Sequence, residues 1–289
     1  MKTFLIVLVV ISIIVLCYII WQKNELKKFM ISKYQIHSAK IKKDANVAVL
    51  ADLHGFEYGK SNTALRKAIK EYSPDLILIA GDMIVSKFPE TYESSLETLK
   101  GLVQIAPVYY SFGNHESRVN TPELTIYPLF REFIKQVEEI GVHVINNETC
   151  DILVNQNRIS LYGLEIDMKY YEKKKDVSMD AHYVTSCLGE PDQEQMNILL
   201  AHNPTYSEQY AAWGADLTFC GHNHGGLIRI PGIGSVFSPQ LTTFPKYDAG
   251  LYHLRGKDVI VSRGLGTHTF HIRINNRAEL MFVRLTPRQ

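Results

Sequence analysis

The feature that most constrains this chain is a series of short apolar stretches that each end in a polar cluster. NVAVLADLH at residues 46–54, DLILIAGD at 75–82 and PVYYSFGNHE at 107–116 have the length of strands. The segments between them, 61–72 and 89–102, have the apolar spacing of helices. This alternation predicts a sheet that is at least partly parallel, with helices on its faces.

The chain becomes richer in strand-length runs after a further predicted helix at residues 123–140. These runs include NILLAH at 197–202 and DLTFCGH at 216–222, whereas the segment 165–192 is charged and without periodicity. We therefore expect an α/β fold of two facing mixed β-sheets flanked by helices, in one domain that spans residues 45–289. The segment 165–192 is expected to be an insertion or a mobile loop with a short helix.

The N-terminus contains an apolar run from Phe4 to Trp21 that has no charged residue. As a helix it would span roughly the hydrocarbon core of a bilayer, with Trp21 at the interface. The run is long and no small-residue cleavage site follows it, which disfavours a cleaved signal peptide. We expect a transmembrane anchor at residues 1–22 and a polar, lysine-rich juxtamembrane linker at 23–44.

The lysines around this run bear on the orientation of the anchor. Only Lys2 precedes it, whereas Lys23, Lys27, Lys28 and Lys33 follow it. The positive-inside bias favours a catalytic domain that faces the cytoplasm. A short anchor that begins with one lysine can also insert the other way, so export of the domain remains an alternative.

Composition excludes two further classes of protein. The formal net charge is only +1, so no nucleic-acid binding is expected. The four cysteines, Cys17, Cys150, Cys187 and Cys220, are far apart and form no CxxC pair. A disulfide framework or a cysteine-based zinc site is therefore not expected.

The polar clusters at the strand ends are the candidate site. Because functional groups gather outside the carboxyl ends of parallel strands, neighbouring strands would bring these side chains to one rim. The candidates are Asp52, His54, Asp82, Asn114, His115, His202, His222 and His224. Each one alone has a structural explanation as a turn, cap or packing residue, but five of the 11 histidines share this placement.

The donor types in these clusters indicate metal binding. Imidazole, carboxylate and amide oxygen suit divalent Mn, Fe, Zn, Co or Ni. The candidates are too many for one ion that must also hold water, and they fit two ions that share a bridging carboxylate. The sequence does not select among the five metals.

In order along the chain, these blocks resemble the signature of the calcineurin-like metallophosphoesterases. The signature reads Asp-x-His, Gly-Asp, Gly-Asn-His-Glu, a single His and Gly-His-x-His, and all five blocks occur between Asp52 and His224. The tail is similar to the membrane-associated bacterial branch, with GGLIRIP at 225–231 and SRGLGT at 262–267. Asn223 departs from that branch, which usually has threonine there. The resemblance covers residues 45–286.

This resemblance implies a four-layer sandwich and a ligand set. One metal would take Asp52, His54, Asp82 and His224, and the other would take Asp82, Asn114, His202 and His222, with Asp82 as the bridge. His115 would lie beside the scissile phosphate and protonate the leaving oxygen. Asp52 and Glu116 are candidates to orient His54 or His115, although Glu116 is equally explained as a helix-start carboxylate.

The resemblance implies hydrolysis of a phosphodiester, phosphomonoester or pyrophosphate bond by metal-activated water. Because an anchor would hold the site near headgroups, a lipid-linked substrate is one option, and the relatives include UDP-diacylglucosamine diphosphatases. A non-catalytic metal-binding scaffold and an amide hydrolase are weaker alternatives, since no ligand is missing and the Asn-His-Glu block is present. Arg229 and Arg263 are weaker candidates to hold a substrate phosphate, with surface salt bridges as the alternative.

Overall fold

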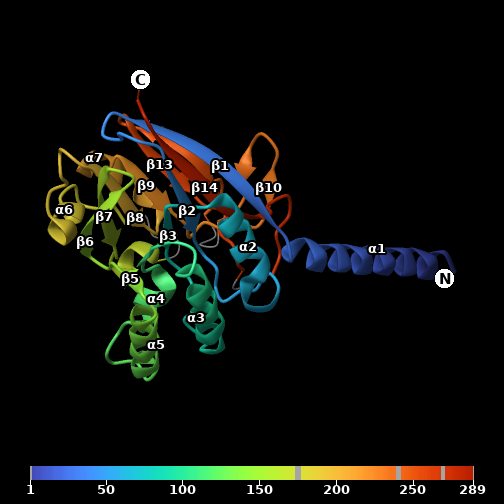
Figure 1. The fold of residues 1–289 in the computed structure, drawn as a ribbon. Helices are drawn as coiled ribbons and strands as arrows, with labels where there is room; N and C mark the ends of the chain where they lie inside the picture. The colour runs from blue at the N-terminus through green and yellow to red at the C-terminus, as the bar shows by residue number, and fades with distance from the viewer. Residues whose placement is uncertain (1, 173–176, 239–241, 268–270, 289) are drawn as a thin grey trace.

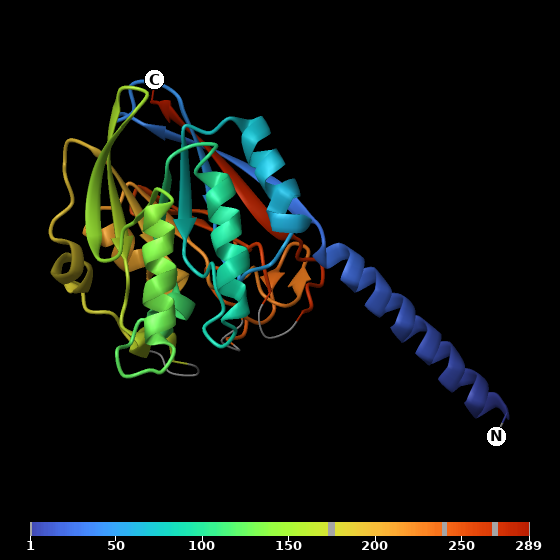
Figure 2. The same ribbon diagram turned by 60° about the horizontal axis from the view of Figure 1, so that its bottom comes forward.

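The computed structural model describes residues 2–172, 177–238, 242–267 and 271–288. It begins with α1 (Lys2–Leu26), which projects from a folded body in Figures 1 and 2. The span Phe4–Leu26 is long and apolar enough to cross a membrane. Its large apolar side chains from Phe4 to Trp21 are exposed instead of packed against the body. These properties fit the predicted anchor, although the helix continues four residues past the expected end.

The body contains two six-stranded sheets. The order in the first is β1 (Phe29–Ser38), β14 (Ala278–Pro287), β2 (Ala45–Leu50), β3 (Leu76–Ala80), β4 (Val108–Ser111) and β5 (Val142–Val144). The order in the second is β12 (Gly250–Leu254), β13 (Lys257–Val261), β9 (Leu217–Cys220), β8 (Met196–Ala201), β7 (Asn157–Leu164) and β6 (Glu148–Val154). Strands β2 to β5 are parallel, as are β13, β9, β8 and β7, whereas β14 is antiparallel to β2 and the edge strands β12 and β6 are antiparallel to their neighbours. Both sheets are therefore mixed, as predicted.

Helices cover the outer faces of both sheets (Figures 1 and 2). The first sheet is covered by α2 (Thr63–Tyr72), α3 (Glu90–Leu102) and α5 (Tyr127–Glu139), and the second by α6 (Tyr183–Leu188) and α7 (Ser207–Trp213). Alternate residues of one strand face different cores, because side chains of a strand point to opposite sides. On β2, Ala48 and Leu50 pack under the helices, whereas Val47 and Val49 pack between the sheets. The molecule is thus the expected four-layer sandwich.

The prediction of a juxtamembrane linker at 23–44 is wrong for residues 29–38. Residues Phe29–Ser38 form β1, which pairs with β14 over its whole length. The lysines suggested a solvated linker, but this edge strand alternates between exposed residues such as Lys33 and covered ones such as Tyr34 and Ile36. An edge strand with one solvated face has the polar composition of a linker.

Several short elements complete the fold. They are η1 (Lys60–Asn62), α4 (Asn114–Val119), η2 (Met168–Tyr171), η3 (Pro204–Tyr206) and the hairpin strands β10 (Arg229–Ile230) and β11 (Gly234–Ser235). The helix expected at 123–140 begins only at Tyr127, where Pro128 occupies the first turn. Because β2, β3 and β4 are parallel, and β8 is parallel to β9, the carboxyl ends of each set lie at one edge of their sheet.

Candidate metal centre

The eight predicted site residues lie together where the carboxyl ends of the two sheets meet. The first sheet contributes residues after β2, β3 and β4, and the second contributes residues after β8 and β9. All eight are buried, namely Asp52, His54, Asp82, Asn114, His115, His202, His222 and His224. The strand-end pattern therefore predicted which side chains the fold would bring together.

Three groups of side chains each have potential ligand atoms that lie within 4.8 Å of one another inside the group. They are Asp52 with His54 and His224, Asp82 with His202 and His222, and Asp82 with His54 and His115. The Oδ2 atom of Asp82 lies 3.2 Å from Nε2 of His202 and 3.8 Å from Nε2 of His54. Asp82 is therefore the carboxylate that stands between the other groups, which is the placement of a bridging ligand.

Backbone carbonyls orient two of the imidazoles. Nδ1 of His202 lies 2.6 Å from the carbonyl oxygen of Ala80, and Nδ1 of His54 lies 3.1 Å from that of Ile84. A carbonyl only accepts hydrogen bonds, so Nδ1 carries the hydrogen and the Nε2 lone pair of each neutral ring points into the cluster. This is the arrangement that commonly orients a histidine that ligates a metal.

His115 is held in the opposite sense. The backbone N–H of Ser86 donates to its Nδ1 at 2.9 Å, and the Ser86 hydroxyl lies 3.1 Å from the same atom. Because Nδ1 accepts a hydrogen bond, the neutral ring carries its hydrogen on Nε2. His115 is thus arranged as a proton donor, in contrast to His54 and His202.

Five residues of the cluster have a strained backbone. The φ angles are 52° at Asp52, 53° at His54, 55° at Asp82, 66° at His222 and 49° at His224. Residues with side chains adopt this left-handed region at a cost of roughly 1–2 kcal/mol each. Such strain gathers where side chains must point to a functional position that an ordinary turn would not reach.

The glycines before the clusters provide room for the carboxylates. A Cβ atom at Gly221 would lie 2.5 Å from Oδ2 of Asp52, and one at Gly113 would overlap Oδ1 of Asp82. The two loops can approach the aspartates this closely only without a side chain. Glycine therefore precedes His222 and Asn114 because the aspartates pack against the backbone there, and not only because the chain turns.

Two buried carboxylates dominate the electrostatics of the cluster: burial opposes the charge of Asp82, but the imidazoles, above all His202, hold its pKa well below the usual value. Burial raises the pKa of Asp52 to about 7, and the adjacent Asp82 carboxylate adds to that rise. Burial opposes the charge of His202 also, but the Asp82 and Asp52 carboxylates outweigh it and raise the pKa of His202 to about 10. Two buried carboxylates thus draw protons onto their neighbours, and a bound cation would take the place of those protons.

Asn114 provides a separate indication of a missing ligand. Its Oδ1 atom is buried and has no hydrogen-bond partner within the described residues. A buried amide oxygen without a partner is costly, so it calls for a group that the protein itself does not supply. Together with the inward-facing imidazoles, this oxygen makes the donor set fit divalent cations.

Glu116 supports the loop that carries Asp82. Its carboxylate accepts hydrogen bonds from the Tyr110 hydroxyl at 2.7 Å and from four backbone N–H groups, those of Asp82, Met83, Ile84 and Gly113, at 2.8–3.2 Å. Burial raises the pKa of Glu116 to about 7, and the Asp82 carboxylate adds to the rise. Glu116 is the helix-start carboxylate that we considered, and it also positions the loop after β3.

Tyr171 was not predicted from the sequence. Its ring centroid lies 5.0 Å from that of His222 and 6.4 Å from that of His202, in an edge-on or tilted arrangement. It comes from η2, inside the segment 165–192 that we expected to be an insertion or mobile loop. That segment has no periodic pattern, so no sequence signal marked the tyrosine that covers the imidazoles.

Arg229 and Arg263 are the weaker candidates for phosphate binding. Arg229 forms an ion pair with Asp248 at 2.9 Å and donates to the Gly225 carbonyl at 3.1 Å. This supports the salt-bridge alternative for Arg229. Arg263 lines a different cavity, beside Trp21 at the end of α1.

Comparisons with known proteins show what the chain is similar to. The model of the calcineurin-like phosphoesterase family matches residues 45–226. Phosphodiesterase YaeI of Escherichia coli (strain K12) is 28% identical over 242 residues, which are 83% of this chain and 81% of that protein. UDP-2,3-diacylglucosamine pyrophosphatase LpxG of Chlamydia trachomatis is 23% identical over 266 residues, with coverage of 76% and 77%. The solved structure of phosphopantetheinyl hydrolase from Mycobacterium tuberculosis has a TM-score of 0.46 at 12% identity, and covers 76% of this chain and 89% of that one.

Proposed function

The chain belongs to the calcineurin-like phosphoesterase family, and on that premise we propose that it hydrolyses a phosphate ester or pyrophosphate of a lipid-linked substrate at a two-cation centre beside a membrane. The observation that carries this proposal is the position of Asp82 between ligand groups from both sheets. A metal-dependent phosphoester hydrolase is the class of enzyme that the family establishes. The substrate, the individual ligands and the membrane side are our proposals.

We assign one cation to Asp52, His54, Asp82 and His224, and the second to Asp82, Asn114, His202 and His222. The support is the grouping of their donor atoms, the orientation of the imidazoles and the partnerless oxygen of Asn114. When bound, such cations would withdraw charge from the phosphoryl oxygens and lower the pKa of water, so that hydroxide is available as the nucleophile near neutral pH. The identity of the metal stays open among Mn, Fe, Zn, Co and Ni.

His115 is the proposed proton donor to the leaving oxygen. The Ser86 N–H occupies its Nδ1, so the neutral ring offers Nε2–H to a substrate oxygen. Its backbone N–H also donates to Oδ1 of Asp82 at 2.8 Å, which ties the position of the ring to the central carboxylate. The side chain that protonates the leaving oxygen and the carboxylate that holds the cations are therefore held together.

The apolar helix α1 favours a substrate that lies in the membrane surface. A relative that is named a UDP-2,3-diacylglucosamine pyrophosphatase makes a pyrophosphate-linked lipid precursor the second candidate. The lysines after the span favour a cytoplasmic-facing domain. Protease accessibility in intact cells measures the side directly, and digestion only after the cells are opened is the expected result.

The experiment that tests the activity uses the full chain in detergent micelles with Mn²⁺. Hydrolysis of an aryl phosphodiester, an aryl phosphomonoester and a lipid extract is followed in parallel. Asp82→Ala is expected to abolish all hydrolysis, whereas Asp44→Ala, which changes an exposed aspartate paired with Arg284, should leave it unchanged. Full activity in Asp82→Ala would contradict the proposed centre, and turnover of aryl esters without any lipid would contradict the lipid-linked substrate alone.

A further inference from the structure

A cavity lies where α1 joins the body, and two of its lining residues, Arg273 and Asn276, also contact His224 of the metal centre. Its volume is about 240 Å³, and its lining includes Trp21, Glu25, Arg263, Arg273, Asn276 and Arg277. We call it the junction cavity. Three arginines and one glutamate give its lining an excess of positive charge, which the phosphoesterase reaction as proposed above does not use.

The junction cavity is fixed at the end of the apolar span. Gln22 is buried and donates from Nε2 to the Arg273 carbonyl at 3.0 Å, and Glu25 forms an ion pair with Arg277. Trp21, which ends the uncharged run of α1, is 47% exposed. Since tryptophan prefers the level of lipid headgroups, the cavity would lie at that level when α1 spans a bilayer.

Arg273 brings a buried positive charge to this cavity. It is 6% exposed, and its guanidinium donates to the carbonyls of Arg263 at 2.8 Å, Gly264 at 3.1 Å and Gly266 at 2.7 Å, and it lies 3.4 Å from Nδ1 of His224. Within the described residues no carboxylate lies at ion-pair distance from it. Neutral groups therefore satisfy its hydrogens, and no carboxylate contacts its charge directly.

Arg263 adds an unsatisfied donor. Its Nε atom is buried without a hydrogen-bond partner in the described part of the chain, and one terminal nitrogen has only the sulfur of Met30 at 3.6 Å. A guanidinium presents its donors in a planar fork that matches two oxygens of a phosphate. Arg263 therefore has donor capacity that a phosphate at the cavity would use.

The surroundings of the junction cavity indicate which side of the body meets the lipid. The hairpin β10–β11 lies beside the end of α1 in Figures 1 and 2, and its base is bridged to the cavity segment by Ile228 and Ile274. Ile233 in this hairpin is 65% exposed, and Phe244 is 61% exposed. Exposed apolar residues next to an anchor suit contact with a membrane.

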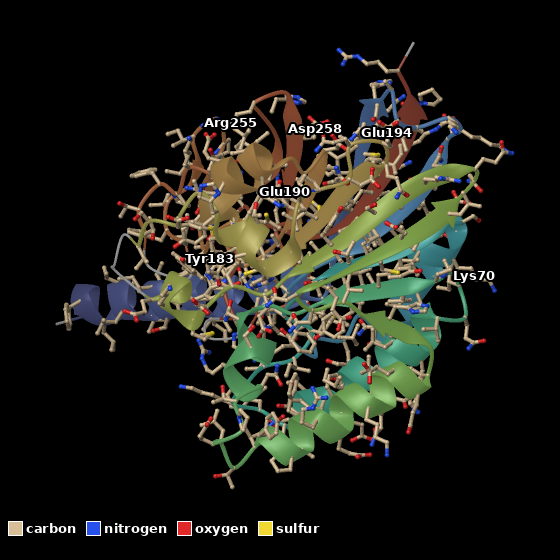
Figure 3. The ribbon with its side chains drawn as sticks, turned by 90° about the vertical axis from the view of Figure 1, so that its left-hand side faces the viewer. Lys70, Tyr183, Glu190, Glu194, Arg255 and Asp258 are labelled. Carbon is tan, nitrogen blue, oxygen red and sulfur yellow. The ribbon has the colours of Figure 1, made fainter. Side chains whose placement is uncertain are left out.

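The opposite side of the body has a different character. Figure 3 views the molecule from the left-hand side of Figure 1, away from the junction, and labels the charged residues Glu190, Glu194, Arg255 and Asp258 there. Glu190, Glu194 and Arg255 are exposed. This contrast favours the α1 side, with its cationic cavity and apolar hairpin, as the side that faces lipid.

We propose that the junction cavity binds the phosphate of an anionic phospholipid headgroup, with Arg263 and Arg277 as the accessible donors and Arg273 as the buried charge behind them. A phospholipid headgroup and a soluble phosphate ester both carry the phosphate oxyanion that these arginines would bind. The lipid is the source because the cavity adjoins the end of the membrane span. Arg273 and Asn276 also contact His224, but within the described residues Arg263 and Arg277 belong to none of the contacts of the proposed metal centre, and the proposal does not depend on the proposed reaction.

The test uses the full chain, stripped of lipid in detergent and kept with a chelator so that the catalytic centre holds no metal. Native mass spectrometry measures the affinity for phosphatidylglycerol, phosphatidylcholine and soluble glycerol phosphate. We expect phosphatidylglycerol to bind most tightly, and Arg263→Gln to weaken that binding about tenfold or more, since the loss removes a charge-assisted hydrogen bond. Arg284→Gln is the control for the loss of one arginine charge, because Arg284 pairs with Asp44, as Arg277 pairs with Glu25, but lies at the other end of β14.

Three results would overturn the proposal. They are an unchanged affinity in Arg263→Gln, equal binding of the two phospholipids, and binding of glycerol phosphate as tight as that of phosphatidylglycerol. Arg277→Gln provides a second variant at the exposed rim if Arg263→Gln fails to fold. Asp82→Ala should keep the lipid affinity of the unmodified chain, so failure of the phosphoesterase assay and failure of lipid binding can be told apart.

Discussion

The two ends of the sheet sandwich are held together by opposite electrostatic arrangements. At the amino ends of β8, β9 and β13, Asp216 is placed between Lys40 at 2.8 Å and Lys257 at 2.6 Å. At the carboxyl ends, the buried carboxylates of Asp52 and Asp82 face imidazoles. The first end balances its charges with its own side chains, whereas the second depends on protons or cations for balance.

This difference separates stability from function along the same strands. At the amino end, the charge of Asp216 is paired with two lysines. These ion pairs join segments that are distant in sequence and have no other evident role. The carboxyl end combines positive φ angles, buried like charges and an amide oxygen without a partner. Such violations persist where a bound group offsets them, so the two ends should respond differently to substitution.

The largest expected effect is that of Asp82→Asn, which keeps the shape of the side chain but removes the shared charge. We expect the metal content to fall from two ions per chain toward none, and kcat/KM to fall by about a thousandfold or more, since several kcal/mol of charge stabilisation is lost. Elemental analysis of the purified chain measures the first, and aryl phosphodiester hydrolysis the second. Two ions retained per chain would refute a bridging role for Asp82.

A smaller effect is expected at the second sheet, which supplies imidazoles and no carboxylate to the ligand groups. His222→Asn should lower the metal content by one ion and reduce kcat/KM by about a hundredfold, because Asp52, His54 and His224 remain for the other cation. The informative comparison is with Asp82→Asn measured under the same metal concentration. Equal losses of metal in both variants would show that His222 does not serve one cation alone.

The strand-end residues could be predicted because parallel strands bring their carboxyl ends to one rim whatever the detail of the loops. Asp52 and His224 are 172 positions apart, yet both follow apolar strands and the fold places their side chains 3.3 Å from each other. The strain at Asp52 and His224 could not be predicted, because φ depends on tertiary contacts. Tyr171 was missed for the same reason, since it reaches the site from a segment without periodicity.

The errors came from charged residues whose partners are remote in sequence. Lys33 made residues 23–44 resemble a solvated linker, but the pairing of β1 with β14 joins positions about 250 residues apart. For Arg229 the sequence left phosphate binding and a salt bridge as alternatives, and the structure shows its pair with Asp248. The composition of a segment shows how polar it is, but only the folded structure shows which other segment its polar groups contact.

An intermediate effect is expected for Glu116→Gln, which acts on the carboxyl end without touching a ligand. The amide nitrogen of glutamine would face backbone N–H groups that now donate to a carboxylate, so the loop with Asp82 should lose its support. We expect metal affinity to weaken by about 10- to 100-fold, as for other residues that orient ligands. Titration of the metal-free chain with Mn²⁺ measures this, with the exposed Glu123→Gln as control, and an unchanged affinity would remove Glu116 from the support of the site.

The smallest effect on catalysis is expected at the amino end. Burial alone would raise the pKa of Asp216, but the hydrogen bonds from Lys257 and Lys40 outweigh it and lower the pKa below its usual value. A carboxyl whose pKa is lowered in the folded state contributes stability above its unfolded pKa of about 3.9, and this contribution is lost as the pH falls through the folded pKa.

Asp216→Asn should therefore lower the free energy of unfolding by about 1 kcal/mol at pH 7 and leave kcat and metal content unchanged. Its deficit relative to the unmodified chain should shrink below about pH 4, where the aspartate of the unmodified chain becomes protonated. Denaturant unfolding of the detergent-solubilised chain at both pH values measures the two deficits. A deficit that stays constant with pH would mean that Asp216 acts through packing, and a loss of metal would mean that the two ends are coupled through the strands between them.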